Sequence, residues 1–354
     1  MTRAADTIVI GTGVIGLSTA NALARRGRSV MLIGEHRSGE ASAAAAGMLA
    51  PSVERSDDTI AFNLAARDLY PDFLENIADT VGVRVPLNRL GVLQVALTER
   101  GVRGLRRTAP PTSRWLERAE LTELEPTLGH ALGAVFNPDD GSVDNVVLMS
   151  ALDEQAEASD LITRLDTSVT SVSRERAAIQ IASGDWYEGE NVVVAAGAWS
   201  AGIAGATAMA DVSPCRGQLT SYHSIGLRHV TYGPRGYLVP RTSGVIVAGS
   251  TMEYTGFDVA TTPGGLAKVK AAAEEIAPAL AISPVVSEWA GLRPVTPDML
   301  PIIGADPQSP HIIYAAGHSR NGILLAPITA LVVSELACGE APSHDITRFR
   351  SGRF

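Results

Sequence analysis

Apolar residues at the start of the chain recur in a pattern that predicts a strand, a helix and a second strand. Thr7–Ile10 is short and β-branched, which is typical of a buried strand. An amphipathic stretch follows and ends near Gly27, and Val30–Ile33 is again a short apolar run. A strand, a helix and a strand in close succession indicate the first unit of a parallel α/β sheet.

The rest of the chain alternates between helical and strand periods, so we expect more than one sheet. Helices are predicted over residues 60–81, 112–124, 146–157, 268–276 and 323–336. Strands are predicted over residues 91–97, 133–136, 161–172, 178–181, 191–196 and 311–316, with alternating antiparallel strands over 218–222, 236–240 and 244–249. The pattern therefore predicts an α/β fold into which a β-rich module is inserted.

Three glycines, Gly11, Gly13 and Gly16, join the first strand to the first helix in the pattern G-x-G-x-x-G. Gly11 permits the tight turn, Gly13 lets the backbone approach a pyrophosphate, and Gly16 lets helix and strand pack closely. The helix N-terminus offers free N–H groups and a favourable dipole to the phosphates. Because the motif stands between a predicted strand and a predicted helix, it predicts a dinucleotide-binding domain.

Composition bounds the class of protein further. The chain has 354 residues, enough for one large or two interleaved domains, and its 45% hydrophobic and 19% charged residues are typical of a globular protein. A net charge of −9 argues against a nucleic-acid partner, and Arg103, Arg106 and Arg107 are interpreted as a solvated helix face. No stretch approaches ~18 consecutive apolar residues, so we expect no membrane span.

The two cysteines, Cys215 and Cys338, stand in no CxxC or Cys–His spacing. We therefore expect neither a disulfide framework nor a metal site. The first residues show no charged segment followed by an apolar run and a cleavage site, so we expect a cytoplasmic protein.

Two arginines stand out as candidates for binding a substrate. Arg293 lies in EWAGLRPVTPD and Arg320 in AAGHSRNGILLAP, each bounded by glycine or proline. The rigid fork of a guanidinium suits bidentate capture of a carboxylate, although each arginine is also open to interpretation as a structural ion-pair partner. The sequence contains no G-x-S-x-G, H-E-x-x-H or P-loop lysine motif, and its seven histidines do not cluster.

Six segments form a more specific pattern: ASAAAAGMLAP, VVVAAGAWS, YLVPR, STMEYTGFD, AGLRPVTPDMLPIIG and AAGHSRNGILLAP. In this order they resemble the flavin-dependent glycine oxidase branch of the D-amino acid oxidase family. The resemblance covers almost the whole chain and is weakest around residues 55–135. It implies FAD, not NAD. It also implies a discontinuous Rossmann-like FAD-binding domain over residues 1–82, 140–215 and 290–354, with an antiparallel substrate domain over 83–139 and 216–289.

The resemblance implies FAD-binding positions along most of the chain. Ser42–Met48 would line the flavin with backbone donors, and the backbone of Val169 would meet the adenine. Trp199, in AAGAWS, matches a second flavin contact, although core packing is an open alternative. The full set is Gly11, Gly13, Val14, Ile15, Gly16, Glu35, Ser42, Ala43, Ala46, Gly47, Met48, Val169, Ala196, Gly197, Trp199, Arg293, His318, Arg320, Asn321, Gly322, Ile323 and Leu324.

The same resemblance implies which residues hold the substrate. Tyr237 of YLVPR and Arg293 of AGLRP would engage the substrate carboxylate. Arg320 would assist the carboxylate or gate the site, with a structural ion pair as the alternative. His318 would hydrogen-bond to nearby backbone or flavin, and a role as catalytic base is not expected because the implied mechanism needs none.

Three further side chains are expected to form the substrate pocket. Met48 and Met252 would wall the cavity, although methionine also fills gaps in cores. Tyr254, in STMEYTGFD, departs from the family pattern and, with the alanine-rich segment 43–46, is expected to reshape the pocket.

The implied reaction is hydride transfer from the α-carbon of glycine or another small amino acid to flavin N5. The neutral amine pushes its lone pair as the C–H bond breaks, and the imine then hydrolyses to a carbonyl product and ammonia. Dioxygen reoxidises the flavin and is released as hydrogen peroxide. Positioning contributes most of the catalysis, and the N-terminus of helix 323–336 would stabilise the reduced flavin if it points there.

Related sarcosine oxidases attach their flavin through a cysteine near the segment that here reads AGLRP. Neither cysteine lies there, so FAD is expected to be bound noncovalently. A biosynthetic oxidase that takes a larger substrate on the same scaffold, such as a glycine-like group of a natural product, is the alternative function. A noncatalytic flavin-binding protein and an NADP-dependent reductase are further alternatives, the second because Gly34, His36 and Arg37 resemble a 2′-phosphate site. A homo-oligomer is also left open.

Gly34 lies 18 residues after Gly16, where relatives in this FAD family usually place a glutamate that grips the ribose. Glu35 is the nearest substitute. A shift by one residue turns a strand side chain to the other face, but the strand ends here, so we expect Glu35 to curl back to the ribose.

Overall fold

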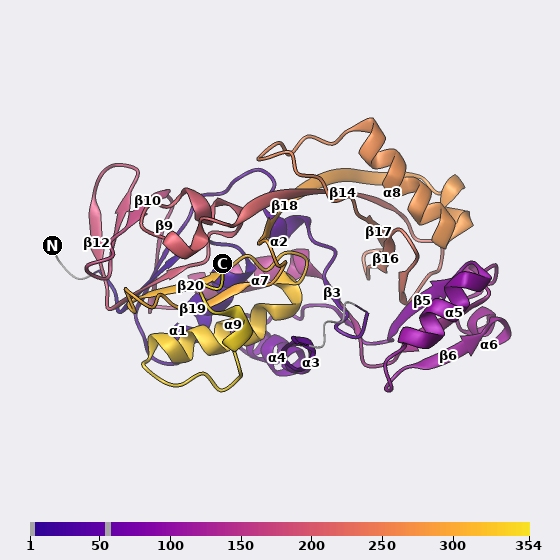
Figure 1. The fold of residues 1–354 in the computed structure, drawn as a ribbon, viewed down its shortest axis with the longest axis horizontal. Helices are drawn as coiled ribbons and strands as arrows, with labels where there is room; N and C mark the ends of the chain where they lie inside the picture. The colour runs from indigo at the N-terminus through magenta and orange to yellow at the C-terminus, as the bar shows by residue number, and fades with distance from the viewer. Residues whose placement is uncertain (1–3, 54–57) are drawn as a thin grey trace.

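A computed structural model describes residues 4–53 and 58–354. One end of the molecule is built on a six-stranded sheet in the order β19-β20-β13-β1-β2-β9, which Figure 1 shows in the half that carries the N-terminus. Its strands are β1 (Thr7–Ile10), β2 (Val30–Ile33), β9 (Ile162–Leu165), β13 (Asn191–Val194), β19 (Ile302–Ala305) and β20 (Ile312–Ala316). All neighbours pair in parallel except β19 and β20.

The central strands of this sheet are apolar along their whole length because both faces are covered. Val9 and Val193 point into one buried cluster, whereas Ile8 and Val192 point into another on the opposite face. A strand buried on both faces shows a continuous apolar run instead of an alternation. The β-branched run at the start of the chain is therefore confirmed as a central strand of a parallel sheet.

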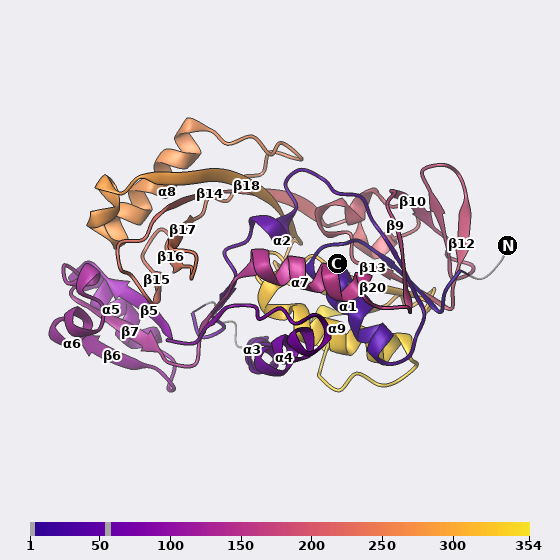
Figure 2. The same cartoon turned by 180° about the vertical axis from the view of Figure 1, so that it is seen from behind.

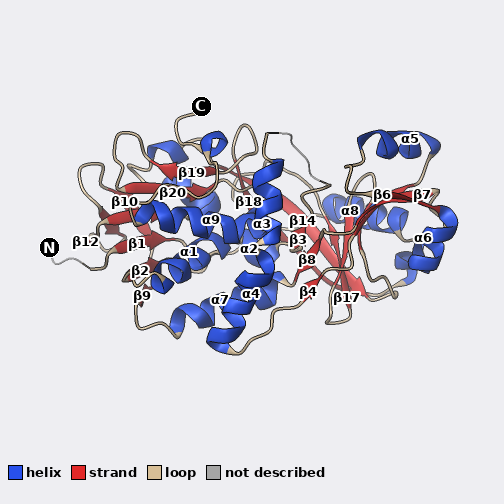
Figure 3. Ribbon diagram, turned by 90° about the horizontal axis from the view of Figure 1, so that it is seen from below, coloured by secondary structure: helices blue, strands red, loops and turns tan. Residues whose placement is uncertain are grey.

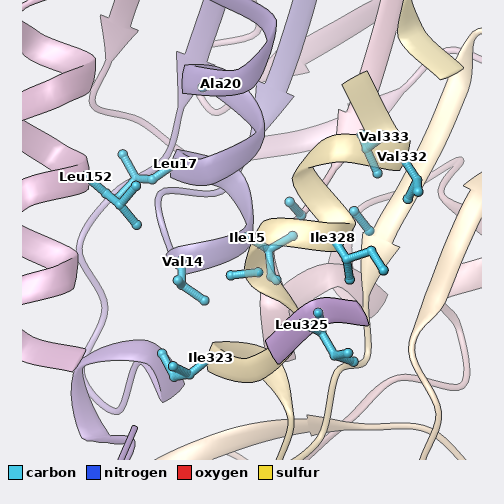
Figure 4. Close-up of a cluster of buried hydrophobic side chains, with 14 of the residues drawn as sticks. Val14, Ile15, Leu17, Ala20, Leu152, Ile323, Leu325, Ile328, Val332 and Val333 are labelled. Atoms are coloured by element: carbon cyan, nitrogen blue, oxygen red, sulfur yellow. The ribbon is translucent and has the colours of Figure 1, made fainter. Parts of the chain in front are cut away.

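Helices lie on one side of the six-stranded sheet (Figure 3). Helices α1 (Val14–Arg25) and α9 (Gly322–Ala337) pack on its strands, and α3 (Ile60–Asp68), α4 (Tyr70–Val81) and α7 (Asn145–Glu157) form a further layer of helices around these two. Figure 4 shows Leu17 of α1 beside Leu152 of α7, and Ile15 of α1 facing Ile328 of α9. Helix α9 is buried on nearly every side, as expected for a helix that is apolar all round.

The opposite face carries a three-stranded antiparallel sheet made of β10 (Val169–Val172), β11 (Ala178–Ile181) and β12 (Trp186–Glu188). Along the described chain there are also five short 3₁₀ helices: η1 (Pro126–Leu128), η2 (Gly197–Gly202), η3 (Thr207–Met209), η4 (Pro278–Ile282) and η5 (Thr347–Phe349).

The other end of the molecule is an eight-stranded sheet in the order β18-β14-β17-β16-β15-β5-β7-β6 (Figure 2). Its strands are β5 (Val92–Ala96), β6 (Arg114–Glu117), β7 (Gly133–Asn137), β14 (Ser213–His223), β15 (Val230–Tyr232), β16 (Tyr237–Pro240), β17 (Val245–Gly249) and β18 (Val285–Val295). Pairing is antiparallel except between β15 and β5. Helices α5 (Glu99–Thr108), α6 (Arg118–Leu124) and α8 (Pro263–Ile276) lie at this end.

The long strands β14 and β18 pair along their length and reach from the eight-stranded sheet toward the six-stranded one. Near the same junction lie α2 (Ala41–Ala44) and a small sheet of β3 (Met48–Leu49), β8 (Gly141–Val143) and β4 (Leu87–Asn88). The division into two domains at the residues given above stays a prediction, since β14 and β18 run across the boundaries at 216 and 290.

Two of the expected helices are wrong in detail. The helix expected over 60–81 is two helices that break at Leu69, because Pro71 at the start of α4 has no backbone N–H to continue the helical ladder. The helix expected over 112–124 begins with strand β6, whose residues pair with β7. Helix α6 starts only at Arg118, where Glu117 and Glu120 form a capping box.

Three other elements also differ from the expectation. The strand expected over 161–172 is two strands of different sheets, β9 and β10. Helix α5, with Thr98 as its N-cap, contains Arg103, Arg106 and Arg107, which were interpreted as a solvated helix face without bounds for the helix. Strand β18 was also not expected, although it is one of the two longest strands. In residues 4–53 and 58–354, no helix combines the length and the apolar character that crossing a membrane requires.

Candidate active site

A cavity of about 790 Å³ is lined by residues of both large sheets. Ile10, Ile33 and Ala315 reach it from the carboxyl-terminal ends of parallel strands β1, β2 and β20, and Leu219 and Arg293 reach it from the long strands β14 and β18. Ligands of open α/β sheets bind outside the carboxyl ends of the strands. The cavity therefore lies where the fold places a ligand.

The glycine turn after β1 forms one wall through its backbone. Gly11 has φ of 112°, and a Cβ atom there would lie 2.3 Å from the carbonyl oxygen of Ala195. A Cβ atom on Gly16 would lie 1.8 Å from the carbonyl oxygen of Gly11. Both contacts are with backbone atoms that cannot move aside cheaply, so the turn requires glycine at these two positions.

The N-terminus of α1 faces the cavity through Gly13, Val14 and Ile15. The N–H of Val14 donates to Oγ of Ser42 at 3.0 Å, and the first turn carries no acidic side chain. Positive potential from the helix dipole is thus left uncompensated where a pyrophosphate would lie.

Gly34 lines the cavity beside Thr12, and this contact gives a physical reason for the missing glutamate. A Cβ atom on Gly34 would lie 3.0 Å from both Oγ1 and Cγ2 of Thr12. Glu35 also lines the cavity, and its carboxylate accepts hydrogen bonds from Ser168 and Arg37, both at 2.6 Å. These bonds, that of Ser168 first, lower the pKa of Glu35, so it presents an ionised carboxylate to the cavity.

An aromatic and cationic stack lies along the same wall. The guanidinium of Arg37 lies 5.5 Å from the ring centre of Trp199, and Phe257 stacks on Trp199 at 5.8 Å. All three side chains line the cavity. Trp199 is therefore half-buried at the wall and not enclosed in a core.

Two polar side chains hold the backbone of α2 and of the alanines that follow it. Nδ2 of Asn145 donates to the carbonyl oxygens of Ser42 and Ala43 at 2.8 and 3.1 Å. Nη2 of Arg241 donates to the carbonyl oxygen of Ala46 at 2.8 Å and to Oδ1 of Asn145. The eight-stranded sheet, which carries Arg241 just after β16, thereby fixes the backbone that lines the cavity.

The start of α9 also reaches the cavity, where Gly322 and Ile323 line it. Figure 4 shows Ile323 and Val14, at the beginnings of α9 and α1, within one group of buried side chains. His318 is buried just before this helix, and its Nε2 lies 3.1 Å from Oγ1 of Thr329. Burial lowers the pKa of His318 to about 3, so the imidazole is neutral near pH 7.

Arg293 lies flat on strand β14 because position 217 has no side chain. A Cβ atom on Gly217 would lie 2.1 Å from Nη1 of Arg293. Nη1 donates to the carbonyl oxygen of Thr251 at 3.1 Å, and Nη2 donates to Oγ of Ser250 at 2.5 Å. These bonds fix the guanidinium at the cavity wall.

The ring of Tyr237, in β16, lies flat over strand β17 in the same manner. Tyr237 is paired with Gly249, and a Cβ atom on Gly249 would lie 2.4 Å from the tyrosine hydroxyl oxygen. Since Ser250 follows Gly249 directly and bonds to Arg293, the phenol and the guanidinium belong to one side of the cavity. A phenol hydroxyl and a guanidinium together suit a carboxylate.

A buried polar network supports strand β14 beside Arg293. Nε of Arg216 donates to Glu253 at 2.7 Å, and Nε2 of Gln218 donates to both oxygens of the same carboxylate at 3.0 and 2.9 Å. Burial opposes ionisation of Glu253, but the bonds from Gln218 and Arg216 outweigh it and lower its pKa.

Most of the residues expected at the site lie around this cavity. The lining includes Gly11, Gly13, Val14, Ile15, Glu35, Ser42, Ala46, Gly47, Met48, Val169, Ala196, Gly197, Trp199, Tyr237, Arg293, His318, Arg320, Gly322 and Ile323. The fold thus brings together positions that lie far apart in the sequence.

Met252 and Tyr254 do not wall the cavity, and the expectation for them is corrected. Their residues are 45% and 68% exposed, and neither belongs to the lining. Glu253 pairs through its backbone with Arg216, and its side chain turns inward to that arginine. Because side chains alternate in extended chain, the neighbours on either side turn outward.

Four other expected positions lie next to the cavity without lining it: Gly16, Ala43, Asn321 and Leu324. Gly16 packs on the glycine turn, and Ala43 offers its carbonyl oxygen to Asn145. Asn321 is the N-cap of α9, and Leu324 points into the apolar core.

The sequence did not reveal several residues that the structure places at the site. Among them are Thr12, Ser168, Gly217, Ser250 and Phe257, which line the cavity, and Gly249, which makes room for Tyr237. Glycines inside alternating strands signal a close approach of another group, so Gly217 and Gly249 carried a usable signal. The contact between Thr12 and Gly34 had none, because it depends on how two loops meet.

This geometry is that of a dinucleotide-binding protein whose cavity also holds a guanidinium and a phenol of a kind that suits a carboxylate. A family model described as FAD dependent oxidoreductase matches residues 6–336. The chain is 33% identical to glycine oxidase of Bacillus subtilis, over 98% of this chain and 96% of that protein. The crystal structure of glycine oxidase from Geobacillus kaustophilus superposes with a TM-score of 0.92 and 30% identity, covering 100% of both chains.

The chain belongs to the FAD dependent oxidoreductase family of D-amino acid oxidase type. The bifunctional protein ThiO/ThiG of Nostoc sp. is 32% identical over 100% of this chain. The chain spans 55% of the length of that relative. The expected family and the expected α/β fold with a Rossmann-like part are confirmed.

The residues at the cavity fit FAD. The backbone cradle at Gly11 and the open N-terminus of α1 suit the pyrophosphate, and the carboxylate of Glu35 suits a ribose hydroxyl. The NADP alternative is wrong for this family, and His36 points away, with 85% of its side chain exposed beside Glu40. No group of three His, Cys, Asp or Glu side chains within the described ranges is arranged to hold a metal ion.

Proposed function

We propose that this protein oxidises glycine or another small amino acid with noncovalently bound FAD. The observation that carries the proposal is the pairing of Arg293 with Tyr237 at the wall of the cavity that also contains the glycine turn. A guanidinium and a phenol in this position recognise a carboxylate, and the glycine turn recognises a pyrophosphate. Glycine oxidases of similar sequence support the choice of substrate.

Arg293 binds the substrate carboxylate in this proposal, and the Tyr237 hydroxyl donates to the same group. Bonds from Arg293 to Ser250 and Thr251 keep the guanidinium in place before the substrate arrives, so little of the binding energy is spent on ordering it. FAD, when bound, supplies the acceptor for the hydrogen and two electrons that leave the substrate α-carbon. The main work of the chain is therefore to hold that carbon in position.

The surroundings of His318 suit a reaction that needs no protein base. The imidazole is neutral and already lies beside Thr329. The N-terminus of α9 places backbone N–H groups and a positive dipole end at the cavity, where they favour negative charge. Since Arg320 also lines the cavity, we propose that it adds positive charge there or gates the site.

Loss of the α-hydrogen as a hydride, which carries two electrons, and of one proton from nitrogen converts the amine to an imine, and addition of water gives a carbonyl compound and ammonia. We propose dioxygen as the final acceptor, which takes up the two electrons and two protons and leaves as hydrogen peroxide. A cytoplasmic location also belongs to the proposal.

The test is to purify the protein, record its visible spectrum and add glycine in the absence of oxygen. We expect a flavin spectrum that bleaches with glycine and returns with air, together with one equivalent of peroxide. A protein that carries no flavin and cannot be reconstituted with FAD would refute the proposal. A flavoprotein that no amino acid reduces would identify a noncatalytic flavin-binding protein instead.

A larger amine substrate is the second candidate. The observation that favours it is the outward position of Met252 and Tyr254, which were expected to narrow the cavity. A panel of amino-acid-bearing compounds in the same bleaching assay separates the two candidates, because a closed pocket rejects large groups.

A further inference from the structure

Arg235 lines the same cavity, in addition to Arg37, Arg293 and Arg320. It stands in the turn between β15 and β16, two residues before Tyr237. Tyr237, the first residue of β16, lines the same cavity. Arg235 and Tyr237 thus bring a guanidinium and a phenol to one cavity from positions two residues apart in the chain.

The turn that carries Arg235 is held tightly. The N–H of Gly233 donates to the carbonyl oxygen of Gly236 at 2.9 Å. A Cβ atom on Gly233 would lie 2.4 Å from Cγ1 of Ile276 in α8, and one on Gly236 would lie 2.7 Å from the carbonyl oxygen of Gly249. The two glycines let the turn pack against α8 and β17, so the backbone of Arg235 has a fixed position.

The guanidinium of Arg235 retains capacity for an anion. Its Nε donates to Oε2 of Glu275 at 2.7 Å, and 62% of its side chain is exposed. Within residues 4–53 and 58–354, Glu275 is the hydrogen-bonded partner of Arg235. The two terminal Nη groups remain as donors, and they form the edge of the fork that binds carboxylates in a bidentate manner.

Arg235 provides a local positive charge in a protein whose net charge is negative. A net charge of −9 gives a doubly negative substrate no general attraction. Glycine has one carboxylate, which Arg293 binds in the proposed function, so glycine offers no group for Arg235 to bind. A substrate with a second carboxylate would engage both arginines.

We propose that Arg235 is a specificity-determining residue and that the cavity accepts small amino acids that carry a second carboxylate. The inference rests on the proposed function, in which Arg293 receives the first carboxylate. Glu275 balances the charge of Arg235 while no such substrate is bound, and the second carboxylate shares or replaces that contact. Recognition at this point contributes to binding and leaves the oxidised C–H bond unchanged.

The test compares three amines with the FAD-loaded protein: glycine, iminodiacetate and N-ethylglycine. N-ethylglycine has nearly the shape of iminodiacetate with a methyl group in place of the second carboxylate. We expect Arg235→Gln to lower kcat/KM for iminodiacetate about tenfold. For glycine and N-ethylglycine, kcat/KM should stay within about twofold of the wild-type value. Glu275→Gln removes the competing carboxylate and should lower KM for iminodiacetate.

The control is Arg348→Gln, which removes another exposed and ion-paired arginine, 58% exposed and outside the cavity lining. It should leave kcat/KM unchanged for all three amines. The preference for iminodiacetate should also weaken as salt is added, because the contact is partly exposed. Equal losses for all three amines in Arg235→Gln would overturn the inference.

Binding without turnover separates this inference from the proposed function. Malonate and acetate are carboxylates that cannot be oxidised as amines, and their binding is followed as a change in the flavin absorbance. We expect the wild-type protein to bind malonate more tightly than acetate and Arg235→Gln to lose that difference. If wild type binds both equally, the inference fails even when glycine is oxidised; if malonate is preferred but no amine bleaches the flavin, the proposed function fails alone.

Discussion

The two ends of the cavity are built by opposite means. At the nucleotide end, Gly11 and the N-terminus of α1 present backbone atoms from one short stretch of chain. At the substrate end, Arg293 and Tyr237 present side chains from two strands, and Gly217 and Gly249 make room for them on two more. The first end is local in sequence, whereas the second exists only once the eight-stranded sheet has formed.

This difference determines what each end tolerates. A backbone cradle depends on the absence of side chains, so an added methyl group harms it. A carboxylate-binding group depends on the shape and charge of side chains, so a conservative exchange harms it. The following predictions are ordered from the largest expected effect to the smallest.

The largest effect is expected from Arg293→Lys, which keeps the charge and loses the fork. A lysine cannot bind the carboxylate in a bidentate manner, and loss of a hydrogen bond to a charged group costs up to about 3 kcal/mol, so kcat/KM for glycine should fall about 100-fold. Steady-state kinetics measures this fall, and the flavin content should stay that of the wild type. A variant that also loses FAD would show that the two ends are not separable.

Gly11→Ala is expected to break the nucleotide end. The new methyl group meets the carbonyl oxygen of Ala195 at a φ of 112°, and strain of about 1–3 kcal/mol raises the Kd for FAD about 10- to 100-fold. Titration of the apoprotein with FAD measures this. Gly104→Ala is the matched control, since a Cβ atom there meets nothing within 4 Å, and it should leave the Kd unchanged.

His318, where the two ends meet, is expected to make stability depend on pH. Its pKa is lowered to about 3 by burial, so the unfolded chain binds a proton below pH 6.5 that the folded chain does not. Stability is therefore lost as the pH falls, by ~1.4 kcal/mol per pH unit from this group. His318→Gln should remove about 2 kcal/mol of the loss between pH 6.5 and pH 5.

Urea unfolding at the two pH values measures that difference. Asp140 acts in the opposite direction, because burial raises its pKa to about 6, but it is present in both proteins and cancels. Identical pH dependence in wild type and variant would contradict the assignment of a buried neutral imidazole.

The smallest effect is expected from Glu35→Ala. Glu35 is held by Ser168 and Arg37 at an exposed edge of the cavity, so its loss should raise the Kd for FAD only about threefold. Ser168→Ala should have the same direction with a smaller effect, and Glu340→Ala, in an exposed ion pair with Arg26 elsewhere, should have none. An unchanged Kd in Glu35→Ala would mean that other groups hold the ribose.

Much of the nucleotide end was predictable from the sequence. The strand, the glycine turn and helix α1 follow from local periodicity and from the conformations that only glycine adopts. The break at Leu69 is also encoded locally, since Pro71 has no backbone N–H to continue the helix. Strand β6 was not predictable in this way, because its pairing with β7 overrode a helical pattern.

The sequence by itself determined the family, the glycine turn at the FAD site and the residue types proposed to bind a carboxylate, because these depend on local backbone requirements and on side-chain chemistry. Only the tertiary structure decided which side chains meet. It turned Met252 and Tyr254 outward through the pairing of Glu253 with Arg216, and it placed Thr12 against Gly34. It also brought Arg235 to the cavity of Arg293, since contacts between residues far apart in the chain depend on strand register and on the packing of whole sheets.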